Sequence, residues 1–196
     1  SLNIRVRTSN RAPALMPVGA RTVAEGQLLQ IALTATDQDL DPLTYSATGL
    51  PRGATFDRQT GVFRWTPDYI QAGAYTVRFE VADGNLARNE VVRITVTNVN
   101  QAPQFVNYDD VLGQEGSSLS FAVMAGDLDG DTLTYYIDGA LPAGAAFDPF
   151  TQTFSWRPDY NQAGMHTVRF GVQDPAGLTD RMDVRIQVLD QNQPPV

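Results

Sequence analysis

The stretch Asp127-Leu128-Asp129-Gly130-Asp131 decides how the rest of this chain is organised, because its pattern occurs earlier as Asp37-Gln38-Asp39-Leu40-Asp41. Each aspartate triplet follows an apolar run of the β type and precedes Leu-Thr-Tyr. Each also lies downstream of an Asn-x-Ala-Pro segment, at 10–13 and at 100–103. An acidic cluster near a boundary between repeated units predicts a cation that holds those units in line.

The two halves of the chain match well beyond the aspartates, in the same order and at an offset that drifts only from 90 to 92 residues. The matching segments are Glu25-Gly26 with Glu115-Gly116, Leu50-Pro51 with Leu141-Pro142, Trp65 with Trp156, Pro67-Asp68-Tyr69 with Pro158-Asp159-Tyr160, and Gln71-Ala72-Gly73 with Gln162-Ala163-Gly164. A register this close indicates two copies of one fold.

Apolar residues alternate with polar or small residues over short runs, as in Leu29, Ile31 and Leu33, and turn residues separate the runs. This period of two predicts half-buried strands, and no stretch keeps the 3.6-residue period of a helix. The strands predicted in the first unit are 14–18, 21–24, 28–36, 43–48, 62–66, 74–82 and 89–97, with the second unit at the same offsets. About seven short strands in about 90 residues indicate an immunoglobulin-like fold. The expected class is all-β, with two tandem Greek-key β-sandwiches.

An alternating apolar run that leads into an Asn-containing linker closes each unit, and the same pattern opens the chain. We therefore expect residues 1–9 to be the last strand of a preceding repeat, followed by one repeat at 10–99 and a second at 100–191. Residues 192–196 would begin the next linker. The sequence is thus expected to be a piece of a longer tandem array.

Composition excludes several kinds of chemistry. The chain has no cysteine and no lysine, so disulfides, thiolate metal sites and lysine nucleophiles are ruled out. A net charge of −8 without a basic stripe argues against binding to nucleic acid or to anionic lipid. No apolar run approaches the roughly 18 residues of a membrane span, so we expect no membrane insertion of this segment.

The repeated motifs resemble those of a known family. Asn-Arg-Ala-Pro (10–13), Ala-Thr-Asp-x-Asp-x-Asp-Pro-Leu-Thr-Tyr (35–45), Phe-x-Trp-x-Pro-Asp-Tyr (63–69) and Val-Ala-Asp-Gly (81–84) are similar to the bacterial cadherin-like, dystroglycan-type or "putative Ig" tandem repeats. The resemblance covers essentially the whole of both units. It implies an extracellular array, often with calcium at the junctions between units. Such arrays occur in large adhesins and in non-catalytic parts of secreted polysaccharide-degrading enzymes.

The resemblance also implies calcium ligands at three junctions. The central junction would use Glu25, Asp68, Asn98, Asn100, Asp127, Asp129 and Asp174. The junction before the first unit would use Asn10, Asp37, Asp39 and Asp83, and the one after the second unit would use Glu115, Asp159, Asp190 and Asn192. Asn98 stands where such linkers carry an aspartate, and Asp68 and Asp159 stand in a motif with one carboxylate fewer than in cadherins. We therefore expect fewer ions per junction than in animal cadherins, with weaker binding at the central one.

Elementary chemistry agrees with calcium at the aspartate triplets. Calcium takes six to eight oxygen ligands, several of them carboxylate. In an extended segment alternate residues point the same way, and carboxylates about 4 Å apart repel by on the order of 4 kcal/mol per pair at an effective dielectric near 20. A bound cation removes this penalty. The alternative is a solvated turn with Asx-type hydrogen bonds. An EF-hand is excluded, because Thr132 stands where that loop requires glycine.

No catalytic constellation is evident. His166 is the only histidine and Tyr75 is its counterpart, which favours a strand-surface position over a catalytic base. Trp65 and Trp156 favour packing within each sandwich, with sugar stacking as the alternative.

We therefore expect a non-catalytic extracellular or cell-surface segment that acts as a calcium-stiffened stalk or adhesion module. The alternative is a carbohydrate-binding or homophilic module accessory to a secreted polysaccharide-degrading enzyme. The expected partners are adjacent repeats of the same chain, with a cell-surface glycan or a second copy as further candidates, and the segment itself is expected to be a monomer.

Overall fold

A computed structural model describes residues 9–192. The contacts divide the chain into two compact units between Val99 and Asn100. The strand expected at 1–9 and the linker expected at 192–196 lie outside the described residues, apart from Ser9 and Asn192. The described elements are all strands, and none of these residues belongs to a helix that is long and apolar enough to cross a membrane.

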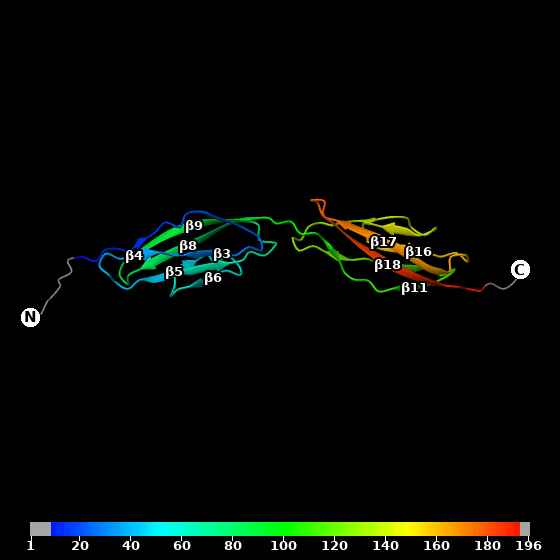
Figure 1. Cartoon of the computed structure of the whole chain (residues 1–196), viewed down its shortest axis with the longest axis horizontal. Coiled ribbons are helices and arrows are strands. Elements are labelled where there is room, and N and C mark those ends of the chain that lie inside the picture. Colours follow the sequence, from blue (N-terminus) through cyan, green and yellow to red (C-terminus); the bar gives the residue numbers. More distant parts are fainter. Residues whose placement is uncertain (1–8, 193–196) are drawn as a thin grey trace, which may run out of the picture. The chain divides into compact units, whose positions relative to one another are not determined.

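Unit 1 is a sandwich of two main sheets (Figure 1). Its strands are β1 (Ala14–Leu15), β2 (Arg21–Ala24), β3 (Leu29–Ala32), β4 (Ala35–Thr36), β5 (Thr44–Thr48), β6 (Thr55–Asp57), β7 (Val62–Trp65), β8 (Gly73–Ala82) and β9 (Ala87–Thr97). One sheet has the order β2-β9-β8-β5, in which β2 runs parallel to β9, and the other has the order β3-β7-β6. The short strands β1 and β4 form a separate two-stranded sheet.

Unit 2 repeats this topology strand for strand (Figure 1). Its strands are β10 (Gln104–Phe105), β11 (Val111–Gln114), β12 (Leu119–Ala122), β13 (Ala125–Gly126), β14 (Thr134–Ile137), β15 (Ala146–Asp148), β16 (Thr153–Trp156), β17 (Gly164–Gln173) and β18 (Thr179–Leu189). The sheets have the orders β11-β18-β17-β14 and β12-β16-β15, with β10 paired to β13. The all-β expectation of two tandem immunoglobulin-like sandwiches is confirmed.

Each unit has its own hydrophobic core, formed by the inward residues of alternating strands. Phe63, Trp65 and Phe79 in unit 1 have at most 1% of their surface exposed. Burying a side chain of this size stabilises the fold by about 1.5–3 kcal/mol relative to leaving it exposed. The same alternation places every second residue of the long strands on the outer face, away from the core.

The predicted strands differ from the structure in three places. The run 28–36 is two strands, because β3 pairs with β7 whereas β4 pairs with β1, so the chain changes sheets near Leu33. The run 14–18 pairs only at Ala14 and Leu15; beyond them the Glu90 carboxylate accepts the backbone N–H groups of Val18 and Gly19 in place of a neighbouring strand. β6 was not predicted, since three residues are too few to show alternation.

The aspartate triplets are turns rather than extended segments. The backbone N–H of Leu40 bonds to the carbonyl of Asp37, and that of Gly130 bonds to Asp127. Leu40 has a φ of 63° and its counterpart Gly130 a φ of 75°. Glycine adopts this left-handed region freely, whereas leucine does not. Unit 1 therefore carries backbone strain at a position where unit 2 carries none.

Leu40→Gly should stabilise unit 1. A side chain in the left-handed region costs about 1–2 kcal/mol, which the substitution removes. The greater freedom of glycine in the unfolded chain cancels about 0.4–1 kcal/mol of this stabilisation. We expect a net stabilisation of about 0.5–1 kcal/mol. Urea unfolding should be followed by Trp65 fluorescence in a Trp156→Phe background, so that the signal reports unit 1 alone.

The matched control is Gly130→Leu in a Trp65→Phe background, which should lower the urea midpoint of unit 2. An unchanged midpoint for both substitutions would show that the two turns are not strained in this way.

Candidate cation site

The aspartate turn of unit 2, residues 127–131, begins at Asp127. Its Oδ1 accepts the backbone N–H of Asp129 at 2.8 Å and that of Asp131 at 3.3 Å. These bonds wrap the turn around the first carboxylate. As a result one carboxylate oxygen from each of the three aspartates lies within 4.8 Å of the others. Sequence reasoning expected this convergence from strand alternation, but its cause is the Asx-type turn.

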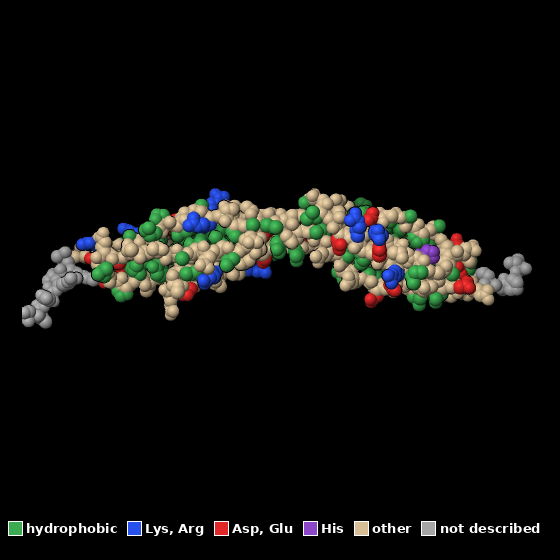
Figure 2. Space-filling view, in the orientation of Figure 1, with side chains coloured by type: hydrophobic (Ala, Val, Ile, Leu, Met, Phe, Trp, Pro, Cys, Tyr) green, Lys and Arg blue, Asp and Glu red, His purple; other side chains and the backbone are tan. Residues whose placement is uncertain are grey.

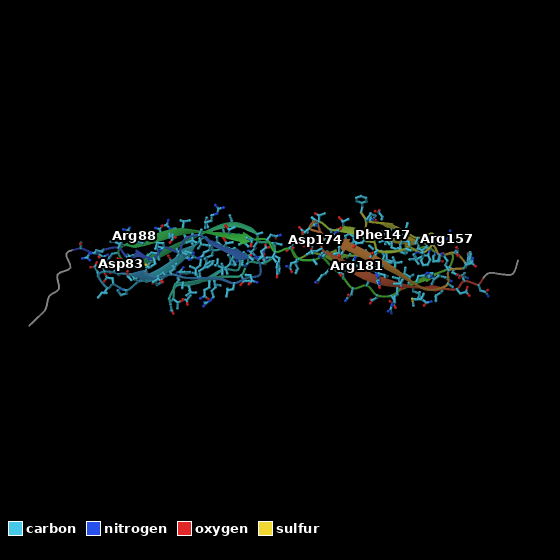
Figure 3. The ribbon with its side chains drawn as sticks, turned by 45° about the horizontal axis from the view of Figure 1, so that its top comes forward. Asp83, Arg88, Phe147, Arg157, Asp174 and Arg181 are labelled. Atoms are coloured by element: carbon cyan, nitrogen blue, oxygen red, sulfur yellow. The ribbon has the colours of Figure 1, made fainter. Side chains whose placement is uncertain are left out.

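The segment that enters unit 2 is attached to this turn by hydrogen bonds. Asn100 donates from Nδ2 to Oδ2 of Asp174 at 2.7 Å, and the backbone N–H of Gln101 donates to Oδ2 of Asp129. Asp174 is 5% exposed and lies in the loop between β17 and β18, labelled in Figure 3. Three parts of the unit, the entering segment, the 127–131 turn and the β17–β18 loop, therefore meet at one end of the sandwich.

Unit 1 builds the same arrangement from its own residues. Asp37 Oδ1 accepts the N–H of Asp39 at 2.7 Å, and the N–H of Arg11 bonds to Asp39 Oδ2 at 2.9 Å. Asn10 Nδ2 donates to Asp83 Oδ2 at 3.0 Å. Asp83, labelled in Figure 3, is the counterpart of Asp174. The structure thus brings together all four residues predicted for the N-terminal site, and in unit 2 it brings together Asn100, Asp127, Asp129 and Asp174.

The carboxylates of unit 2 oppose one another electrostatically. Burial raises the pKa of Asp131, and the negative charges of Asp127, Asp129 and Asp174 raise it further. Burial alone would also raise the pKa of Asp174, but hydrogen bonds from Asn100 and from backbone amides of the β17–β18 loop hold it below its ordinary value. The cluster therefore gathers negative charge that the protein compensates only in part.

Within residues 9–192, three oxygens of these turns are buried and have no hydrogen-bond partner: Asp37 Oδ2, Asp127 Oδ2 and Asp129 Oδ1. A buried carboxylate oxygen without a donor is costly, because it has lost water and gained nothing in return. A hard divalent cation supplies what these atoms need, and carboxylate oxygens are the ligands that calcium prefers. The residues present therefore fit a calcium ion.

The opposite end of each unit is closed by a buried glutamate. Glu25 is 2% exposed; its Oε1 accepts the N–H of Gln71 at 2.9 Å and its Oε2 that of Val99 at 3.0 Å. Glu115, also 2% exposed, accepts N–H groups from Gln162, Ala163 and Gln191 at 2.7–3.0 Å. We call Glu25 with Gln71 and Val99, and Glu115 with Gln162, Ala163 and Gln191, the closing clamps.

The closing clamp explains two of the repeated motifs. Gly26 has a φ of 72° and its N–H bonds to the carbonyl of Pro67 at 2.8 Å. A Cβ on Gly26 would lie 3.0 Å from the hydroxyl oxygen of Tyr69, so the site needs glycine on both grounds. The Gln71 side chain accepts the N–H of Asp68. Gln71 and Gln162 were missed as functional residues, although their repetition in the sequence was a usable signal.

The other predicted ligands lie near the closing clamps, with Asp68 half-buried and the rest exposed. Asp68 Oδ1 accepts the N–H of Ile70 at 3.3 Å, and Asp159 Oδ1 that of Asn161 at 2.9 Å, so each caps its own turn. Asp190 is exposed and lies beside Glu115. Asn98 and Asn192 are exposed. The role of Glu25, Asp68, Asn98, Glu115, Asp159, Asp190 and Asn192 as ligands stays a prediction.

The two tryptophans pack in the cores, as the sequence favoured, because Trp65 and Trp156 are 1% and 2% exposed. Neither is available to stack on a sugar. His166 lies on strand β17 and is partly exposed, as expected. Its ring also packs against Trp156, with centroids 4.8 Å apart, and its Nε2 lies 2.9 Å from the carbonyl oxygen of Gln162. Tyr75 takes the same place on Trp65 in unit 1.

The sheet topology, the tandem repeat and the acidic turns define a class, the cadherin-like immunoglobulin sandwiches. Among solved structures, the EC1-2 segment of human protocadherin-24 superposes with a TM-score of 0.51 at 21% identity, covering 92% of this chain and all of that one. The EC1-4 segment of Drosophila N-cadherin gives 0.53 at 18% identity, covering 92% of this chain and 50% of that one. At these identities the likeness shows the fold.

The chain belongs to the family described as "Putative Ig domain", whose family model matches residues 12–99 and 102–189. It is 33% identical over 129 residues, 64% of its length, to chitinase A of Pseudoalteromonas piscicida. It is 28% identical over 173 residues, 87% of its length, to the serine-rich adhesin for platelets of Staphylococcus aureus strain MRSA252. The chain spans only 16% and 12% of these two relatives.

The closing clamp of unit 2 predicts a specific pH dependence. The backbone N–H of Gln191, with those of Ala163 and Gln162, lowers the pKa of Glu115 in the folded state. Together these bonds outweigh burial, which would raise that pKa. A group with a lowered folded pKa stabilises the fold above its unfolded pKa, and that stability is lost as the pH falls through the folded value. Glu115→Gln should therefore unfold at lower temperature than wild type at neutral pH, and the difference should shrink below about pH 4.3.

The measurement is thermal unfolding from pH 7 to acid, followed by Trp156 fluorescence in a Trp65→Phe background. Asp159→Asn, which removes one charge at an exposed position of the same end, is the control and should leave the unfolding temperature nearly unchanged. A difference between wild type and Glu115→Gln that is constant with pH would contradict the clamp.

Proposed function

We propose that this chain is a non-catalytic, extracellular spacer or accessory segment in which calcium binds the aspartate turns at the start of each repeat. The observation that carries the proposal is the set of buried carboxylate oxygens without hydrogen-bond donors, Asp37 Oδ2, Asp127 Oδ2 and Asp129 Oδ1. The expectation from the motifs supports it, as does the cadherin-like fold of each unit.

In unit 2 the ion would be held by Asp127, Asp129 and Asp131, with Asp174 beside them. In unit 1 the corresponding residues are Asp37, Asp39 and Asp41, with Asp83. When bound, calcium supplies positive charge that offsets the repulsion among these carboxylates. Arg11 and Gln101 already bond to the second aspartate of each turn. Fixing that aspartate would therefore also fix the segment through which the chain enters the unit. Motion between each repeat and the linker that leads into it would then be reduced.

The ligand set in this proposal is smaller than the one implied by the motifs. Both oxygens of Glu25, and both of Glu115, accept backbone N–H groups of their own unit. Their charge is used to close the sandwich. The proposal therefore assigns calcium to the entering end of each unit and a purely protein-built clamp to the closing end.

The relatives support a non-catalytic role in a larger secreted or surface protein. One relative is named as an adhesin and the other as a chitinase. Each contains a segment that resembles this chain, and that segment makes up a small share of the relative's length. A module that recurs in such different settings is suited to spacing or presentation. The adhesion partner or attached catalytic domain would then lie elsewhere in the parent protein.

Calorimetric titration of the full chain with calcium tests the proposal. Wild type should bind with measurable heat, and Asp127→Asn/Asp129→Asn should weaken binding to unit 2 at least about tenfold. Asparagine keeps the Oδ1 acceptor that shapes the turn, so a loss of binding reports the missing charge and oxygen ligand. At a calcium concentration about 100 times the dissociation constant, the unit should be stabilised by about 2.7 kcal/mol.

The charge-matched control is Asp109→Asn/Asp110→Asn, two exposed aspartates outside the turn. It should leave the isotherm unchanged. Asp37→Asn/Asp39→Asn should remove the unit 1 component separately. The proposal fails if wild type gives no heat, or if the control pair weakens binding as much as the substitutions in the turn do.

A further inference from the structure

One row of residues on the outer face of unit 2 has a composition that the fold does not require. Tyr136 on β14 pairs with Gly171 on β17, which in turn pairs with Arg181 on β18. Their neighbours along these strands, among them Tyr135, Phe170 and Val172, point into the core, so the row faces outward. Figure 2 shows acidic and basic side chains gathered over β17 and β18.

The Tyr136 ring lies over Gly171, in space that is free because Gly171 has no side chain. A Cβ built on Gly171 would overlap the Cζ, Cε2 and hydroxyl of the Tyr136 ring. The glycine has a negative-φ strand conformation, so its backbone does not demand glycine. Gly171 is buried, whereas Tyr136 remains partly exposed. The ring thus fills the space over Gly171 while part of it stays exposed, and we call this ring the aromatic platform.

Two ion pairs border this platform. Arg169 bonds to Asp183 through both Nε, at 2.7 Å, and Nη2, at 3.0 Å. Arg181 Nε bonds to Asp138 Oδ2 at 2.6 Å. The side chains of all four residues are 37–54% exposed. Two bonds hold the Arg169 guanidinium and one bond holds that of Arg181. A guanidinium has five N–H donors, more than these bonds engage.

Unit 1 keeps one residue of this surface, because Arg78 is the counterpart of Arg169 and pairs with Glu80 at 3.3 Å, but most of the other residues differ. Ser46 replaces the tyrosine, Glu80 replaces the glycine, and Asn89 replaces Arg181. Val91 stands in place of Asp183. The tyrosine, the glycine beneath it and Arg181 therefore occur together in unit 2 and are absent together from unit 1. The fold alone does not explain them.

We infer that the surface formed by Tyr136, Gly171, Arg181, Asp138, Arg169 and Asp183 binds a neutral polysaccharide. A flat aromatic face offers the C–H-rich side of a pyranose ring a surface to stack on, while the polar groups at its border bond to hydroxyls. Carboxylates accept and guanidinium groups donate, which matches hydroxyls that do both. The site lies on an open sheet rather than in a cavity, which suits a polymer lying across it.

The charges favour a neutral ligand. The two arginines are each paired with an aspartate, so the four border residues sum to zero and leave no net attraction for an anion. The protein as a whole carries −8, which disfavours acidic polymers further. This site shares no residue with the aspartate turns, so the inference is independent of the calcium proposal and binding should persist in chelator.

Depletion onto insoluble chitin and cellulose, together with titration of the full chain with N-acetylchitohexaose and cellohexaose, tests the inference. Wild type should bind at least one of the two polymers, in calcium and in chelator alike. Tyr136→Ser, which installs the unit 1 residue, should weaken binding at least about tenfold. Gly171→Ala should weaken it similarly by displacing the ring, while Tyr136→Phe should retain most of it.

Two controls separate binding from folding. Tyr160→Ser removes an exposed tyrosine at the closing end of the same unit and should bind like wild type. Trp156 fluorescence should show that Tyr136→Ser still unfolds cooperatively. Transplanting the row into unit 1 with Ser46→Tyr/Glu80→Gly/Asn89→Arg should add binding to the Tyr136→Ser chain.

Four results would overturn the inference. The first is that wild type binds neither polymer nor oligosaccharide, and the second is that Tyr136→Ser binds as well as wild type. The third is that binding disappears in about 1 M NaCl, which would indicate an ionic ligand. The fourth is self-association in sedimentation that Tyr136→Ser abolishes, which would identify a second copy of the chain as the occupant.

Discussion

Each unit depends on hydrogen bonds between carboxylates and the backbone N–H groups that are not paired within the sheets. Two short sheets satisfy the amides in the middle of a sandwich but not those in the loops at its ends, and a buried N–H without a partner costs about 1–3 kcal/mol. In this chain acidic side chains fill that need. Glu25 serves the loop after β7, Asp83 serves Asn85 and Leu86, and Glu90 serves the segment after β1.

This constraint accounts for the acidity of the protein. Twenty-two acidic residues against fourteen arginines give a net charge of −8, and many of the carboxylates act as acceptors rather than as solvated surface charge. At the closing end of a unit the acceptors are matched to donors, as for Glu115 with three N–H groups. At the entering end more carboxylate oxygens converge than there are donors, as Asp127 Oδ2 and Asp129 Oδ1 demonstrate. The difference between matched and unmatched oxygens is what separates a structural clamp from a candidate calcium site.

Much of this architecture could be predicted from the sequence, because the repeat allowed each motif to be recognised twice. Alternation located the long strands β8 and β9, and the Asp-x-Asp-x-Asp pattern located the turns. The split of 28–36 between two sheets and the three-residue β6 could not be found, since neither leaves a periodic signal of its own. Glu25 and Glu115 were singled out as ligands from their position in the motif, but which donors their oxygens meet depends on loops more than forty residues away.

The outer faces of the sheets illustrate a different limit. Tyr136, Gly171 and Arg181 are far apart in the sequence, and no motif contains them. Only the register of β14, β17 and β18 brings the three together. The two repeats thus keep one skeleton and one set of loop carboxylates while their exposed faces diverge, as expected if the skeleton serves as a spacer and the faces carry individual binding properties.

Hydrogen exchange of the full chain in calcium and in chelator tests the central claim most directly, because it compares the two ends of each unit in one experiment. The account predicts that calcium increases protection of the amides tied to the aspartate turns, those of Gln101, Asp129 and Asp131 and of their unit 1 counterparts. The amides of Gln71, Val99 and Ala163, which are held by Glu25 and Glu115, should exchange at the same rate in both conditions. Equal exchange everywhere, or protection confined to the glutamate-bound amides, would contradict it.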